Sequence, residues 1–126
     1  MKCDFLAIGA HPDDVELGCG GTIIKLIAEG KTVSVIDLTE GELGTRGTAE
    51  TRAEEAAEAA KILGISSREN LKLKDGFLNN SEDYQLKIVE KIRKYKPEIV
   101  LANAIDDRHP DHAKAAKLVS DACFLS

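Results

Sequence analysis

All three histidines of this chain lie in two short turns that also carry aspartates. The first turn reads His-Pro-Asp-Asp over residues 11–14, and the second, over 106–112, ends in His-Pro-Asp-His. Each turn follows an apolar run, which predicts that each comes directly after a buried strand. Imidazole and carboxylate groups are ligands of zinc and are also the usual general acids and bases. If the two turns meet, they could hold a divalent cation.

The segments around these turns alternate between strand and helix patterns. We expect strands over 4–9, 32–38, 71–73 and 98–102, and helices over 15–28, over 51–63, around 86–92 and from 111 onward. Four alternations predict an α/β fold of the Rossmann-like kind, with a parallel sheet, right-handed crossovers and helices on both faces. The common strand order 3-2-1-4 makes the first and fourth strands neighbours, so the two turns would face each other across the crevice where the order reverses.

Local signals mark the helix ends. Gly30 and Gly64 are expected to end the first two helices, and the Thr-x-x-Glu pattern over 51–54 predicts a capping box. Glycines at 18, 20 and 21 fall inside the first helix pattern, where each costs about 1 kcal/mol relative to alanine. We expect them to allow close packing against a strand or against a metal-bearing loop.

The composition excludes several classes of partner. The chain has 126 residues, as expected for one domain (1–126), and a net charge of -5 without a basic face, so a nucleic-acid partner is not expected. No secretory signal or membrane-length apolar run is present, so no membrane contact is expected. The cysteines, Cys3, Cys19 and Cys123, are odd in number and lack ligand spacing, which is typical of a reducing compartment. We therefore expect a cytoplasmic location.

A catalytic zinc ion takes three His, Asp or Glu ligands and keeps a fourth position for water. His11, Asp14 and His112 would supply such a set, although another divalent ion is also compatible with it. Water on such an ion has a pKa of about 7, so a neighbouring carboxylate can deprotonate it. Asp13 is the candidate for that general base.

Each feature also has a structural interpretation. Asp13 and Asp14 could simply cap a helix, and Pro12 and Pro110 could simply start one. A metal could staple the two turns without catalysis. A phosphatase with a nucleophilic aspartate would leave the histidines without a role. A nucleotide-binding module is disfavoured because the glycine pattern at 18–20 lacks the third glycine and follows two carboxylates.

The pairing of Ala-His-Pro-Asp-Asp-x-Glu at 10–16 with His-Pro-Asp-His at 109–112 resembles the LmbE-like, or PIG-L, family of zinc-dependent N-deacetylases. The segments at 18–23 and 41–48 are most similar to the branch that deacetylates N-acetylglucosaminyl malate in bacillithiol biosynthesis. The resemblance implies a metal-dependent amidohydrolase that acts on a small N-acetyl sugar conjugate. It also implies a homo-oligomer.

The resemblance assigns a role to each site residue. It implies the zinc ligands His11, Asp14 and His112 and the general base Asp13, as the residue types alone indicate. His109 would stabilise the tetrahedral oxyanion as an imidazolium, with Asp111 as its orienting partner. Arg46 would bind substrate, since its forked cation suits a carboxylate such as that of malate; a solvated loop arginine is the alternative.

Members of this family are usually longer, with further strands and helices after the His-Pro-Asp-His segment. The chain therefore resembles an N-terminal part of such a protein, in which the zinc ligands are present and activity requires a separate test.

Overall fold

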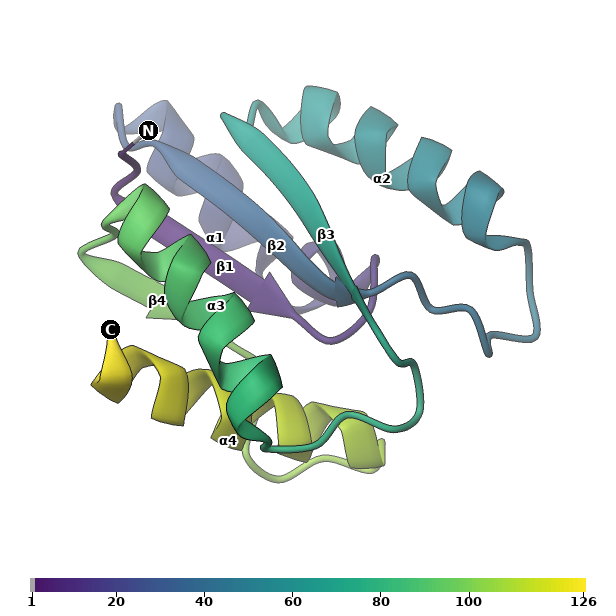
Figure 1. Ribbon diagram of the computed structural model, residues 1–126. Coiled ribbons are helices and arrows are strands. Elements are labelled where there is room, and N and C mark those ends of the chain that lie inside the picture. Colours follow the sequence, from purple (N-terminus) through teal and green to yellow (C-terminus); the bar gives the residue numbers. More distant parts are fainter. Residues whose placement is uncertain (1) are drawn as a thin grey trace.

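The computed structural model describes residues 2–126 as a parallel sheet between helices (Figure 1). The elements in chain order are β1 Phe5–Gly9, α1 Asp14–Ala28, β2 Val33–Thr39, α2 Ala49–Leu63, β3 Ser67–Leu73, α3 Glu82–Tyr95, β4 Ile99–Leu101 and α4 Pro110–Leu125. The strand order is β3-β2-β1-β4, which confirms the predicted α/β fold and its order 3-2-1-4.

The sheet brings the two histidine turns to the same edge. β1 pairs with β2 on one side, with Gly9 opposite Asp37, and with β4 on the other, with Ala7 opposite Leu101. Both pairings are parallel, so the carboxyl ends of β1 and β4 lie side by side. Residues 10–14 and 102–112 leave the sheet from these neighbouring ends.

Two apolar layers hold the sheet in place. On one face, β1 and β2 pack with α3 and α4 around buried Leu6, Ile36, Ile88 and Leu118. On the other face, a smaller cluster around Ile23 joins α1 to the sheet. Figure 1 shows α1 behind the sheet and α3 in front of it. Every residue of β2 is buried, as expected for a central parallel strand covered on both faces.

Within residues 2–126 the longest helix is α4, with 16 residues. No helix in this part of the chain is both long enough and apolar enough to cross a membrane.

The start of α2 differs from the predicted one. The helix begins at Ala49, and its capping box joins Thr48 to Thr51, so the prediction of a box over residues 51–54 was wrong by three positions. The Thr48 side chain accepts a hydrogen bond from the Thr51 backbone N–H at 3.1 Å, and the Thr48 N–H donates to the Thr51 hydroxyl at 2.7 Å. Threonine replaces the expected glutamate because its hydroxyl reaches the same N–H.

The glycines of α1 do not provide close packing. A Cβ added at Gly18, Gly20 or Gly21 would meet no neighbouring atom within 4 Å, so that expectation was wrong. Instead the helix is kinked at Cys19, where φ is -144°. The close approach occurs at Gly9, where an added Cβ would lie 3.1 Å from both the Asp14 Cβ and Val15 Cγ2. Gly9 therefore lets the start of α1 fold back against the end of β1.

Strand β3 begins at Ser67, before the predicted 71–73. The prediction missed the first half of the strand because that half is polar. At its centre Glu69 accepts hydrogen bonds from Lys91 at 2.9 Å, from Lys94 at 3.0 Å and from the Tyr95 hydroxyl, all on α3. A pattern search for apolar residues misses such a segment, in which ion pairs rather than apolar contacts join strand to helix.

The Glu69 cluster predicts a specific loss of stability in acid. Burial opposes the ionisation of Glu69, but hydrogen bonds from Tyr95, Lys91 and Lys94 outweigh it and lower its pKa to about 2. Because this pKa is lower in the folded chain than in the unfolded one, the carboxylate stabilises the fold above the unfolded value and loses this effect as pH falls toward 2. Glu69→Gln should lower the free energy of unfolding at pH 7 and make little difference near pH 2, measured by denaturant titration. Glu58→Gln on the exposed surface of α2 is the control, and equal pH dependence in the two variants would contradict the prediction.

Candidate metal centre

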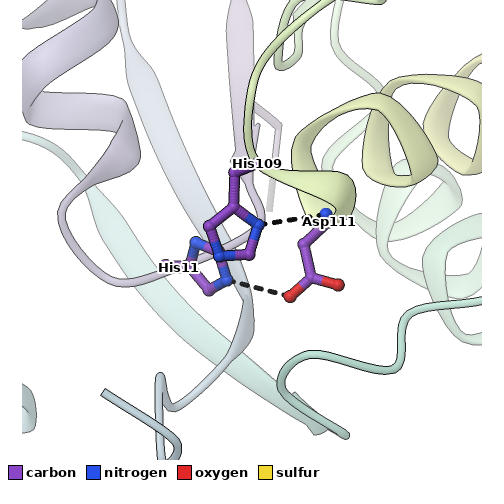
Figure 2. Close-up of side chains that lie close together, drawn as sticks. All are labelled: His11, His109 and Asp111. Atoms are coloured by element: carbon purple, nitrogen blue, oxygen red, sulfur yellow. Dashed lines mark hydrogen bonds and ion pairs between the residues drawn. The ribbon is translucent and has the colours of Figure 1, made fainter. Parts of the chain in front are cut away.

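The two histidine turns meet at the carboxyl end of the sheet, as the strand order predicts. The ring centroids of His11 and His112 are 5.4 Å apart, and His109 lies 4.7 Å from His11 and 5.0 Å from His112. Figure 2 shows His109 beside the ring of His11, with Asp111 at the start of α4 pointing toward His11. Groups about 100 positions apart in the sequence thus form one cluster.

His112 presents a nitrogen that no hydrogen bond uses. Its Nε2 atom is buried and lies 3.1 Å from Asp14 Oδ2, in a geometry that is not a hydrogen bond. Its other nitrogen, Nδ1, lies 3.0 Å from the carboxylate of Asp107. A carboxylate on one ring nitrogen orients the other toward a metal, which is the usual outer arrangement of a metal-binding histidine.

His11 has the same division of its two nitrogens. Its Nε2 atom lies 3.0 Å from Asp111 Oδ2 and 3.1 Å from Asp75 Oδ1. Its Nδ1 atom faces Asp14 Oδ2 at 3.4 Å. Nδ1 is therefore the nitrogen directed at the same point as His112 Nε2, and the two carboxylates on the far side fix the ring.

The charges around His11 favour a cation. Burial opposes a charge on this imidazole, but Asp14, Asp111 and Asp75 outweigh burial and raise its pKa to about 9. Burial likewise opposes ionisation of Asp14, yet the hydrogen bond and charge of His11 and the charge of His112 lower the pKa of its carboxyl group. The site is thus electronegative at neutral pH, which suits either a proton or a metal ion.

Residues 2–126 contain two groups whose ligand atoms lie within 4.8 Å of one another: His11, Asp14 and His112, and His11, His109 and Asp111. In the second group His109 Nδ1 accepts the Asp111 backbone N–H at 3.1 Å, and Asp111 Oδ2 accepts the Gly76 N–H at 2.8 Å. Each group holds one buried atom without a hydrogen bond, His112 Nε2 in the first and Asp111 Oδ1 in the second. Because His109 Nδ1 and Asp111 Oδ2 of the second group already accept backbone N–H groups, the residues of the first group fit a divalent cation better.

Asp13 lies between Pro12 and Asp14 in the first turn. It is the N-cap residue of α1, but its side chain makes no capping hydrogen bond, and it is exposed. No hydrogen bond or ion pair of its carboxylate is found within residues 2–126. A simple capping role does not account for Asp13, and its carboxylate is available to a reactant.

Asp111 contacts His109 differently from the expected way. Its carboxylate lies against His11, and only its backbone N–H reaches His109 (Figure 2). His109 is the N-cap residue of α4, and accepting this N–H at Nδ1 leaves Nε2 as its donor. The contact that orients His109 is therefore made by the Asp111 backbone and not by its carboxylate.

Arg46 lies in the exposed loop between β2 and α2, and its side chain makes no hydrogen bond or ion pair within residues 2–126. The loop is tied to the cluster through Asp75: the Leu43 N–H donates to Asp75 Oδ2 at 2.8 Å, and the Asp75 N–H donates to Glu42 at 2.9 Å. The same Asp75 carboxylate touches His11. The loop that carries Arg46 is thus attached to the first turn, residues 11–14, which we call the metal turn.

Asn103 and Asp75 are site residues that the sequence analysis missed. Asn103 accepts the Ala10 N–H at 3.0 Å and donates to Asp14 at 3.3 Å, so it joins the end of β4 to the first turn. Its position directly after an apolar run was the available signal. Asp75 stands in an Asp-Gly pair, which indicates a turn. Nothing in the sequence distinguishes an aspartate that only forms a turn from one that also contacts a histidine.

A cavity of about 570 Å³ adjoins the cluster between α1 and β4. Asp14, Asn103, Asp107 and His112 contribute its polar wall, and β1, β4 and α1 its apolar wall. The cavity is large enough for a sugar-sized ligand.

Comparison with known proteins places this arrangement in a family. Residues 6–123 match the PIG-L family, described as GlcNAc-PI de-N-acetylase. The chain is 35% identical to the uncharacterized deacetylase YaiS of Escherichia coli over 94% of its own length and 67% of that protein. It is 37% identical to diacetylchitobiose deacetylase of Thermococcus kodakarensis over 93% of its length and 48% of the enzyme.

A solved structure agrees with the fold. The conserved protein TT1542 from Thermus thermophilus superposes with a TM-score of 0.93 at 45% identity, covering 98% of this chain and 56% of TT1542. The chain spans between about half and two thirds of the length of these three relatives. From the match over nearly its whole length and the shared fold, the chain belongs to the PIG-L family.

Proposed function

We propose that this chain holds a divalent cation with His11, Asp14 and His112 and hydrolyses the N-acetyl group of an N-acetylglucosamine conjugate. The observation that carries the proposal is the convergence of His112 Nε2, which has no hydrogen bond, with His11 Nδ1 and Asp14 Oδ2 beside a cavity. The deacetylases among its relatives support the reaction class. Zinc as the ion, a cytoplasmic location and a homo-oligomer remain predictions.

When bound, the cation would polarise the amide carbonyl and lower the pKa of a water molecule. Asp13 takes the proton of this water as the water oxygen attacks the carbonyl carbon, and then gives the proton to the departing nitrogen as the C–N bond breaks. The products are acetate and a primary amine. His109, through its Nε2–H, donates to the oxygen on which negative charge develops.

Substrate orientation falls to the loop over 41–48. Arg46 is exposed there and is free to form a bidentate pair with a carboxylate. N-acetylglucosaminyl malate combines an N-acetyl sugar with such carboxylates, and we propose it as the substrate. The alternative, a neutral N-acetyl sugar, would give Arg46 no anionic partner.

Two other functions fit the geometry less well. A structural zinc site normally has four protein ligands, whereas the group around His112 supplies three. A nucleotide-binding role would need glycines in a phosphate loop, but Gly18, Gly20 and Gly21 lie within α1.

Metal titration distinguishes the two candidate ligand groups. His112→Ala should abolish stoichiometric zinc binding, whereas His109→Ala should retain it, because only the first group uses His112. Isothermal titration calorimetry and elemental analysis of the isolated chain provide the measurement. Loss of zinc in His109→Ala with retention in His112→Ala would assign the ion to the other group. No binding of zinc or of another divalent ion by the unmodified chain would overturn the proposed function.

Asp13→Asn should keep zinc binding and lower the rate of amine release about 10²- to 10⁴-fold, since it removes the proton acceptor and leaves the ligands intact. The rate is followed by amine-specific fluorescence with N-acetyl sugar substrates. Asp106→Asn, an exposed aspartate of the second turn, is the control. Turnover at the rate of the unmodified chain would remove Asp13 from the mechanism.

Arg46→Ala should raise KM for N-acetylglucosaminyl malate at least about tenfold, the equivalent of one lost charge-assisted hydrogen bond. It should leave KM for neutral N,N'-diacetylchitobiose nearly unchanged. Arg108→Ala, which removes an exposed arginine from the second turn, is the matched control. Equal effects on both substrates would return Arg46 to a solvated loop residue.

A further inference from the structure

Arg68 on β3 lies outside the cluster of histidines but reaches the back of their first turn. Its side chain is only 8% exposed, which is unusual for an arginine. Residues from four other segments surround its guanidinium group. A buried arginine with so many partners must be held by them, and it must hold them in turn.

The first partner is Asp37 at the end of β2. Arg68 Nε donates to Asp37 Oδ2 at 2.7 Å and Nη2 donates to Oδ1 at 2.9 Å, a bidentate pair. Asp37 is 2% exposed, and its register partner on β1 is Gly9. The pair therefore fixes the guanidinium group directly beneath the strand end from which the metal turn leaves.

The second set of partners belongs to the metal turn itself. Arg68 Nη2 donates to the carbonyl oxygen of Pro12 and, at 3.0 Å, to Glu16 Oε1 in the first turn of α1. Pro12 separates His11 from Asp13 and has no N–H of its own, so its carbonyl is its one backbone hydrogen-bonding group. Arg68 thus holds the turn by hydrogen bonds at two points. One is Pro12, between the candidate ligand and the candidate base, and the other is Glu16, just beyond Asp14.

A further hydrogen bond joins Arg68 to the neighbouring helix α2. Arg68 Nη1 donates to the Ala56 carbonyl of α2 at 3.4 Å. A lysine at position 68 would provide one point charge on a flexible stem and could not form the bidentate pair while also reaching Pro12. The planar, five-donor group is what the arrangement requires.

We propose that Arg68 is a positioning residue of the metal centre, which acts through the Pro12 carbonyl and Glu16 to hold His11 and Asp14 in binding geometry. The inference rests on the proposed metal site. It concerns the placement of the ligands before the ion arrives, and not contact with the ion or the substrate.

Stability alone cannot serve as the test, because losing Arg68 also leaves Asp37 buried without its cation. Burial raises the pKa of Asp37 to about 6 even though Arg68 opposes this shift. The required control is a variant that breaks a comparable ion-pair cluster elsewhere. Glu69→Gln does so at the next residue of β3, where the partners are on α3 instead of the metal turn.

The experiment compares Arg68→Lys with Glu69→Gln in the intact chain. We measure the melting temperature without metal, the zinc Kd well below that temperature, and the visible absorption of the Co²⁺-loaded chain. Since each variant is then fully folded, lost stability by itself does not change Kd. Arg68→Lys should weaken zinc binding about tenfold and alter the Co²⁺ spectrum, as partners of metal ligands do. Glu69→Gln should change only the melting temperature.

Equal zinc Kd values and Co²⁺ spectra for the two variants would overturn the inference and leave Arg68 a structural residue. If Arg68→Lys does not fold, Glu16→Gln replaces it, with a smaller loss of zinc affinity expected and an unchanged Kd overturning the inference. Absence of binding of zinc or of any other divalent ion by the unmodified chain would instead overturn the proposed function. The two failures are therefore distinguishable.

Discussion

The site depends on the pairing of β1 with β4. This ladder covers only three residue pairs, from Phe5 with Ile99 to Ala7 with Leu101, yet it is what places the ends of two distant segments side by side. Asn103 extends the pairing by bonding the Ala10 N–H and Asp14. A short parallel ladder, buried in β1 and partly exposed in the edge strand β4, therefore assembles the histidine cluster.

Charge compensation acts on both sides of the first turn. On the side of the histidine cluster, the carboxylates of Asp14, Asp75 and Asp111 surround His11 and favour a positive charge there. On the opposite side, Arg68 forms ion pairs with Asp37 and Glu16. One side is satisfied by a resident side chain, and the other is left for a proton or a metal ion. A turn held rigidly from behind presents its ligands in front without further ordering cost.

The sequence predicted the strand order and the meeting of the histidines because period and turn chemistry are local signals that topology rules can extend. It failed where the stabilising contacts are polar and distant. The first half of β3 depends on Glu69 and its α3 partners, and the partners of Asp75 lie more than thirty residues away. The direction of the Asp111 carboxylate was equally hidden, since the choice between His11 and His109 depends on how α4 docks. Predicting such contacts requires the packed structure.

The Asp75 carboxylate has one oxygen on the His11 imidazole and the other on the Leu43 amide. The orientation of the His11 imidazole and the conformation of the loop over 41–48 are therefore coupled through Asp75. By reciprocity, any molecule that favours one loop conformation through this contact changes the free energy of the ring's preferred state by the same amount. A ligand bound to the loop therefore changes the affinity of His11 for its own ligand, and the ligand of His11 changes the affinity of the loop by the same factor.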